Sequence, residues 1–118
     1  MNVTRVAEAP GYTAPKHRHV HTVRLQGHEA GPTERFWVGL SAYRPGAIAE
    51  KASAREETVY VVLDGELIVT SEGTETVLNR LDSVHFAKGE IRSIENRSGS
   101  AALLLVTIAH PQEEASSS

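Results

Sequence analysis

The sequence predicts an all-β protein, either a β-sandwich or a β-barrel. Short segments rich in β-branched and apolar residues recur along the chain, and each is closed by a turn signal. No window carries a sustained apolar period of about 3.6 residues, which an amphipathic helix would show. Two segments, TVYVVL (58–63) and ALLLVTI (102–108), are apolar at successive positions, which is typical of strands covered on both faces.

The N-terminal half begins with a polar stretch. Residues 1–20 contain two prolines and are predicted to form an arm with at most one short edge strand. Residues 21–27 alternate weakly, as a strand does, and residues 27–33 read as a loop because of their Gly and Pro content. Residues 35–46 are predicted to be a strand that ends at a Pro-Gly turn.

The middle of the chain carries the clearest turn signal. Residues 57–65 and 66–73 are predicted to form a hairpin around Asp64 and Gly65, because Asp-Gly between two apolar runs favours a tight turn. Residues 74–86 are predicted to give two short strands, interrupted by the polar Asn-Arg pair in their middle.

The C-terminal part adds two strands, 91–96 and 101–109, after a turn at 87–90. The chain then ends in HPQEEASSS, which is poor in apolar residues, so residues 111–118 are predicted to be a disordered tail. We therefore expect one barrel domain over residues 21–110.

Composition narrows the class of protein. The 118 residues suffice for one domain, and the formal net charge of -3 with no long basic run argues against nucleic acid as a partner. The chain has no cysteine, which excludes disulfides and thiolate sites. Its first residues lack an apolar signal segment and its longest apolar run is too short for a membrane span, so we expect a cytoplasmic protein with no membrane partner.

The two doubly apolar strands also bear on assembly. A small barrel has difficulty covering both faces of such strands by itself, so a second subunit against one outer face is expected, giving a homodimer. The alternative is that the N-terminal arm covers that face.

The spacing of the turns resembles the cupin family of jelly-roll barrels, also called double-stranded β-helices. The first family motif, G-x5-H-x-H-x3/4-E-x6-G, fits from Gly46 to Gly65 without a gap. The second motif, G-x5-P-x-G-x2-H-x3-N, fits from Leu81 onward, and Gly89 and Asn96 match it. The resemblance implies a cupin barrel over about residues 36–108, and this fold supports many chemistries.

The metal-ligand positions of these motifs are substituted. The two histidines and the glutamate of the first motif are Ala52, Ala54 and Thr58, and the histidine of the second is Arg92. Alanine has no lone pair and a protonated arginine repels a cation. We therefore expect no metal cofactor. A metal-dependent cupin with non-standard ligands is the alternative.

The resemblance implies a barrel pocket with altered contents. The four substituted positions, together with Tyr60, are expected to face it. Arg92 would hold a small organic anion in space left by the two alanines, because guanidinium binds carboxylates bidentately. The alternative is that Arg92 reaches the barrel mouth and pairs with Glu90 or another acid.

Further candidates surround this pocket. His85 is a candidate acid or base and Tyr60 a candidate proton donor, if His85 faces inward. Trp37 and Tyr43 share parity on one strand and could wall the pocket or belong to a packed core. The run HRHVH (17–21) places three histidines at alternate positions, where they would bind a metal only if they converge.

Three functions are compatible with these residues. The first is a metal-independent enzyme that isomerises, cyclises or cleaves a small organic anion by acid-base chemistry. The second is a non-catalytic sensor or carrier of such an anion, and the third is an accessory subunit with a packed interior. The absence of a clear acid-base pair in the sequence leaves the choice open.

Overall fold

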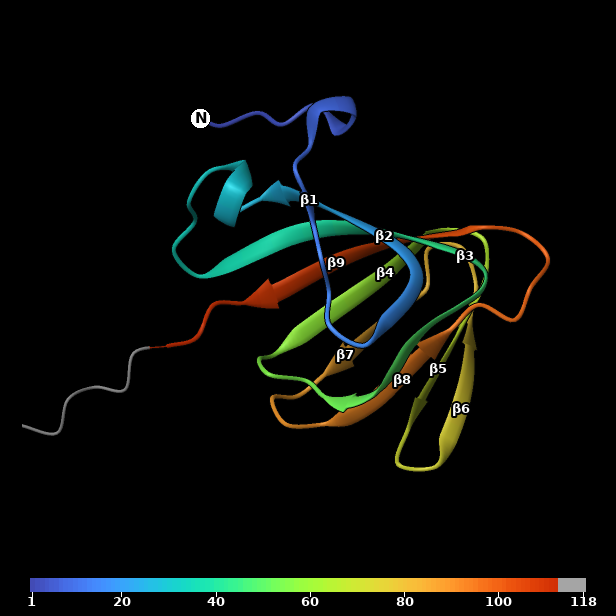
Figure 1. Ribbon diagram of the computed structural model, residues 1–118. Helices are drawn as coiled ribbons and strands as arrows, with labels where there is room; N and C mark the ends of the chain where they lie inside the picture. Colours follow the sequence, from blue (N-terminus) through green and yellow to red (C-terminus); the bar gives the residue numbers. More distant parts are fainter. Residues whose placement is uncertain (113–118) are drawn as a thin grey trace, which may run out of the picture.

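The protein is an all-β barrel with the strand order of a jelly roll, which confirms the predicted fold class (Figure 1). A computed structural model describes residues 1–112. Hydrogen bonds connect the strands in the order β6-β5-β8-β3-β9-β4-β7, while β2 pairs with β3 and β1 with β2. The elements are η1 (Val6–Glu8), β1 (Gly11–Tyr12), β2 (His17–Gln26), η2 (His28–Ala30), β3 (Phe36–Ser53), β4 (Thr58–Asp64), β5 (Leu67–Ser71), β6 (Thr74–Leu78), β7 (Ser83–Phe86), β8 (Ile91–Glu95) and β9 (Ala102–Ala109).

The long strand β3 belongs to both walls of the barrel. Its first half, from Phe36 to Tyr43, pairs with β9, and its second half, from Ile48 to Ser53, pairs with β8. The predicted strand therefore does not end at the Pro-Gly step. The chain bends there and continues, because both halves find partners on either side of the bend.

The bend in β3 is held by Asn96, which has no exposed surface. Its backbone exchanges hydrogen bonds with the backbone of Gly46 and Ala47, each 2.9 Å long. Its side-chain Nδ2 donates to the carbonyl oxygens of Tyr43 at 3.0 Å and Ser100 at 2.8 Å. Buried carbonyl groups need such partners, so this asparagine fixes the corner at which the two walls join.

The predicted hairpin around Gly65 is wrong. Strand β4 pairs with β7 and β9, whereas β5 pairs with β6 and β8, so the turn carries the chain from one wall of the barrel to the other. Gly65 has φ +78°, and a Cβ there would lie 2.8 Å from the carbonyl oxygen of Ala101. The glycine is required for this close crossing, and the true hairpin is β5-β6.

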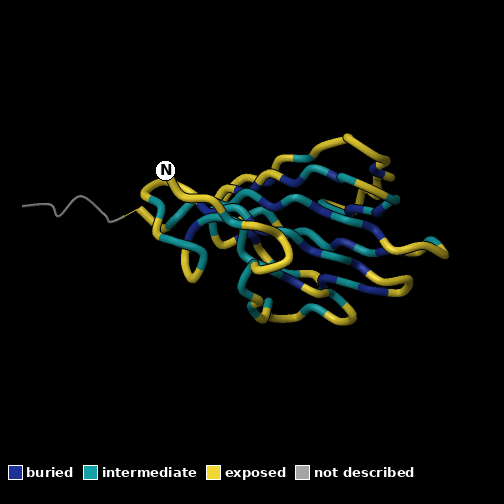
Figure 2. The backbone as a smooth tube through the Cα atoms, turned by 90° about the horizontal axis from the view of Figure 1, so that it is seen from above, coloured by how far each residue is buried: buried dark blue, intermediate teal, exposed yellow. Residues whose placement is uncertain are grey.

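Half of the barrel interior is a packed core. Burial alternates along the strands, and exposed residues concentrate in the loops and the N-terminal segment (Figure 2). The largest fully buried apolar side chains outside the cavity described below are Leu67, Phe86, Ile94 and Val62. Within residues 1–112 no helix is long and apolar enough to cross a membrane.

The ends of the chain differ in part from the expectation. Strand β2 starts at His17, so the barrel strands begin before residue 21. The preceding segment is tied to the barrel, since the side-chain Nδ2 of Asn2 donates to the Gln26 Oε1 oxygen and to the carbonyl oxygen of Ala30. Pro111 and Gln112 are exposed, and the rest of the predicted tail lies outside the described residues.

Candidate functional site

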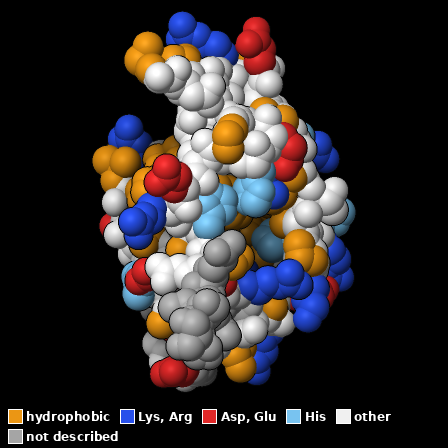
Figure 3. All heavy atoms as spheres, turned by 90° about the vertical axis from the view of Figure 1, so that its left-hand side faces the viewer, with side chains coloured by type: hydrophobic (Ala, Val, Ile, Leu, Met, Phe, Trp, Pro, Cys, Tyr) orange, Lys and Arg blue, Asp and Glu red, His pale blue; other side chains and the backbone are white. Residues whose placement is uncertain are grey.

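The other half of the interior is a cavity of about 580 Å³, open at one end of the barrel. Figure 3 shows that end, with histidine side chains gathered near its centre. The cavity is lined from the inner faces of the strands and from the loops around the mouth. Among the residues that were candidates from sequence, it is lined by Trp37, Tyr43, Ala52, Ala54, Thr58, Tyr60 and Arg92.

A β-bulge in β3 determines which residues in the second half of this strand face the cavity. Ala49 pairs with Ile94 and Ala52 pairs with Arg92, so β3 has one residue more than β8 over the same stretch. The extra residue shifts the alternation from the buried Ala47 and Ala49 to Ala52 and Ala54. Glu50 lines the cavity and has the same parity as Ala52, so alternation from the motif positions could have found it, although the sequence analysis did not name it.

The family's ligand positions contribute little chemistry of their own. Ala54 and Thr58 are 5% and 4% exposed, and the hydroxyl of Thr58 donates to the carbonyl oxygen of Glu56 at 2.9 Å. The residues at the family's ligand positions thus offer two methyl groups, a hydroxyl already engaged and a guanidinium. They do not fit a transition metal.

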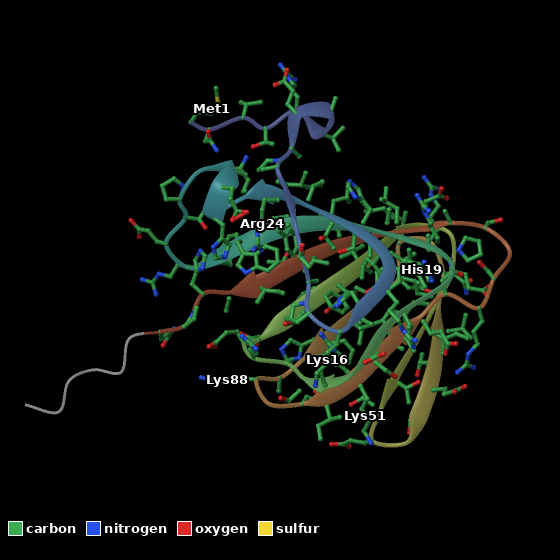
Figure 4. All side chains as sticks on the ribbon, viewed as in Figure 1. Met1, Lys16, His19, Arg24, Lys51 and Lys88 are labelled. Atoms are coloured by element: carbon green, nitrogen blue, oxygen red, sulfur yellow. The ribbon has the colours of Figure 1, made fainter. Side chains whose placement is uncertain are left out.

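The histidine run does not converge either. His19 has φ +59°, and the pairing of β2 with β3 shifts between Arg18 and Val20, so the three side chains do not share one face. His17 lines the cavity, whereas His19 and His21 are exposed (His19 is labelled in Figure 4). Residues 1–112 contain no group of three or more His, Cys, Asp or Glu side chains placed to hold a metal ion.

His17 is the imidazole that the sequence reasoning did not assign to the pocket. Its Nδ1 lies 2.7 Å from the carbonyl oxygen of Pro15, which can only accept, so Nδ1 carries a proton and donates. Burial lowers the pKa of His17, and the positive charge of Arg92 lowers it further, against the opposing effect of the Pro15 hydrogen bond. The ring is therefore neutral at pH 7, with the Nε2 lone pair available.

His85 lies outside the cavity. Phe86 and Val84 pack into the core, so His85, between them on β7, points to the outer surface. Its Nε2 is 2.7 Å from the Glu57 carboxylate, and both side chains are more than half exposed. A base in the barrel must reach a ligand there, so the structure does not bring His85 together with the other candidate residues.

The tyrosines form the inner floor. Tyr43 and Tyr60 are 1% and 4% exposed, and Tyr12 reaches in from β1. Burial raises the pKa of Tyr43 and of Tyr12; for Tyr12 the nearby Arg24 charge opposes this. The phenols of Tyr12 and Tyr43 therefore stay protonated at neutral pH. The tyrosine hydroxyls can form hydrogen bonds with a ligand.

A second cluster near the mouth is built around Arg24, on β2 (labelled in Figure 4). Its guanidinium carbon lies 3.7 Å from the ring centre of Tyr12 and 4.2 Å from that of Trp37, which are cation-π contacts. Its Nε lies 3.5 Å from the Glu29 carboxylate. Gly39 permits this arrangement, since a Cβ there would lie 2.8 Å from the Trp37 ring.

Two carboxylates also line the cavity in the described part of the chain, Glu50 and Glu56. The Glu56 side chain is 16% exposed and lies 3.7 Å from Lys88 Nζ, on the turn between β7 and β8. The Glu50 side chain is 45% exposed and lies 3.3 Å from Arg18 Nε. The cavity lining thus includes acids, phenols, the neutral imidazole of His17 and the guanidinium groups of Arg24, Arg55 and Arg92. These groups suit proton transfer and recognition of a polar ligand.

The chain belongs to the cupin family. The family model described as a cupin domain matches residues 39–108. A curated relative from Mycobacterium tuberculosis, named Beta-D-galactosidase Rv1717, is 68% identical over 114 residues, which cover 97% of this chain and 98% of the relative.

Solved structures with low sequence identity share the fold. The polyketide cyclase RemF from Streptomyces resistomycificus superposes with a TM-score of 0.83 at 14% identity, over 97% of this chain and 82% of that chain. A predicted oxalate decarboxylase from Thermotoga maritima superposes with a TM-score of 0.77 at 21% identity, over 94% of this chain and 100% of the other.

Proposed function

We propose that this protein hydrolyses β-D-galactosides in the barrel cavity. The observation that carries the proposal is the 68% identity, across 97% of the chain, to a protein named a β-D-galactosidase. Glycoside hydrolysis usually needs two carboxyl groups, one to protonate the leaving oxygen and one to act as a base or nucleophile. The presence of two acidic side chains in the lining is consistent with that requirement.

We assign the acid role to Glu56, because its side chain is the more enclosed of the two. Glu50 is more open to solvent, where water can reach it, and takes the role of base or nucleophile. The floor tyrosines and the neutral His17 offer hydrogen bonds for sugar hydroxyls. This assignment replaces His85 as the acid-base candidate.

The first test compares hydrolysis of p-nitrophenyl β-D-galactopyranoside with its α-anomer. Glu56→Gln and Glu50→Gln should each lower kcat/KM by about 100-fold or more, since general acid-base catalysis contributes that much. Glu34→Gln, an exposed glutamate that does not line the cavity, is the matched control. The proposal is wrong if the wild type does not hydrolyse the β-anomer, or if both cavity variants keep its full activity.

Arg92 favours a second candidate, the binding of a small organic anion, with or without its isomerisation, cyclisation or cleavage. Its buried Nε has no hydrogen-bond partner among the described residues. A thermal-shift series of organic acids, measured on wild type and Arg92→Ala, tests this candidate. It fails if no acid stabilises the wild type or if the substitution leaves the shift unchanged.

We also propose that neither function uses a metal ion. The support is the residue types at the family's ligand positions, where Ala52, Ala54, Thr58 and Arg92 form a poor donor set. A homodimer in the cytoplasm, without nucleic-acid or membrane partners, completes the proposal. The net charge of -3 supports the part of the proposal that excludes nucleic acid.

A further inference from the structure

We propose that the galactoside accepted by this cavity is acidic, and that Arg92 binds its anionic group. The inference rests on the proposed galactosidase function and names the substrate class of the same site. The observations behind it are the position of the Arg92 guanidinium in the cavity and its lack of a hydrogen-bond partner and of an acidic partner among the described residues.

Arg92 has no acidic partner in residues 1–112. It lies on β8 opposite Ala52 and lines the cavity, and its Nε is buried without a hydrogen bond. Glu90, the partner expected from sequence in the alternative case, is engaged elsewhere: it accepts from the Ser71 hydroxyl at 2.8 Å and from the Ala87 amide at 3.1 Å. No carboxylate of the described residues lies within 4.0 Å of the Arg92 side chain.

Two titratable neighbours of Arg92 inside the cavity, His17 and Tyr43, are neutral at pH 7. The charge of Arg92 acts on His17, whose pKa is lowered mainly by burial, and on Tyr43, whose pKa is raised by burial, so neither carries a negative charge at neutral pH. Glu50, two residues before Ala52 on β3, pairs instead with Arg18 at 3.3 Å. A guanidinium does not lose its proton in a protein, and an anionic ligand would supply the counter-charge that the described residues do not.

Another arginine of the cavity, Arg24, differs in this respect. Arg24 is stacked between Tyr12 and Trp37, and although its Nε also lacks a hydrogen bond, the Glu29 carboxylate lies 3.5 Å away. Its charge therefore has a partner from the protein. Arg55 and Lys16 also line the cavity, but both are exposed residues whose charges water can solvate. The buried, unpaired Nε of Arg92 therefore points to Arg92 as the group that selects for an anion.

The volume of the cavity supports a single ligand that carries both the acidic group and the sugar. About 580 Å³ lies within the range of roughly 300–1,000 Å³ that encloses a drug-sized molecule, which is larger than a simple organic acid. The small side chains of Ala52 and Ala54 leave room beside Arg92. A glycoside that carries a carboxylate, on the sugar or on the aglycone, satisfies both the volume and the charge.

The test uses matched pairs of substrates that differ by one acidic group. The first pair is p-nitrophenyl β-D-galactopyranoside and p-nitrophenyl β-D-galacturonide, with the acid on the sugar. The second is phenyl and 4-carboxyphenyl β-D-galactopyranoside, with the acid on the aglycone. In one of the two pairs the acidic member should have a kcat/KM higher by roughly 10- to 100-fold, as expected for a charge-assisted hydrogen bond.

The variants show whether Arg92 is responsible. Arg92→Gln should abolish the preference and Arg92→Lys should retain part of it, while Arg80→Gln, which removes an exposed arginine away from the cavity, should leave it unchanged. Calorimetric binding of D-galacturonate against D-galactose, or of the acidic aglycone against its neutral analogue, gives a readout independent of turnover. Thermal melting confirms that each variant is folded.

The failures are distinguishable. If neutral galactosides are hydrolysed as well as both acidic ones, or if Arg92→Gln keeps the preference, the inference is overturned and the hydrolase function stands. If no galactoside is hydrolysed, the hydrolase function falls and takes the inference with it. Binding of an acid that depends on Arg92 would then support the second candidate function.

Discussion

Leu81 stands at the position where the second cupin motif has a glycine, and its backbone shows why a glycine suits the place. Its φ is +70°, in the left-handed region that costs an L-residue about 1–2 kcal/mol. Its side chain is 65% exposed, so it recovers little of this cost by burial. The turn is kept by a hydrogen bond from the Leu81 amide to the carbonyl of Val62.

Leu81→Gly should therefore stabilise the protein, by about 0.5–1 kcal/mol once the greater freedom of glycine in the unfolded chain is subtracted. The measurement is the free energy of unfolding in urea. Ile91→Gly is the control, because Ile91 is also about half exposed but lies in strand β8, where glycine should destabilise. A loss of stability in Leu81→Gly would contradict this account.

The residues of the site differ in whether the neighbouring sequence was enough to predict their place in the cavity. Ala52, Ala54, Thr58 and Arg92 were expected at the cavity because the motif spacing fixes their places. Arg24 was not, since its role depends on Tyr12 and Trp37, which reach it from other strands. His85 is the converse case: its residue type suggested chemistry, and only the burial of its neighbours shows that it faces outward.

Among the elements, β3 contributes most to the architecture of the barrel, because both walls depend on its bend. Asn96 holds that bend through two side-chain hydrogen bonds to backbone carbonyls. Asn96→Ala should lower the free energy of unfolding by about 1–3 kcal/mol, since it leaves a buried carbonyl without its donor. The control is Asn79→Ala, an exposed turn asparagine; equal effects of the two substitutions in urea unfolding would count against the role of Asn96.

The positions of the strands were predicted better than the pairing between them. In residues 1–112 the strands fall largely within the predicted strands and arm, apart from the second half of β3, because turn residues and apolar runs are local features. The pairing of β4 with β9, which lie about forty residues apart, leaves no local trace. The Asp-Gly step looked like a hairpin because the same left-handed glycine serves both a tight turn and a crossing between walls.

At the scale of the molecule, the outer face of the β3-β9-β4 wall is apolar. Leu40, Leu105 and Val61 are neighbours across the three strands, and all are only half-buried. The N-terminal segment does not pack closely on the barrel with its own apolar side chains, since Val3 and Val6 are 59% and 63% exposed. This face is where we expect the partner subunit of the proposed homodimer.

Sedimentation velocity at micromolar concentration should find a dimer for the wild type and a monomer for Leu105→Glu, because a charge cannot be buried unpaired in an apolar interface. Val77→Glu, on the exposed strand β6, should remain dimeric. A monomeric wild type, or a dimer that survives Leu105→Glu, would leave the outer face without this role.

The continuity of β3 also bears on how this protein can admit a ligand. One strand supplies both Trp37 near the mouth and Ala52 beside Arg92, so a continuous backbone joins the two walls. A ligand that enters at the mouth passes the rim, where residues 13–16 and 54–57 lie outside the strands. Residues of both loops line the cavity, so substitutions there would change the path of entry as well as the binding surface.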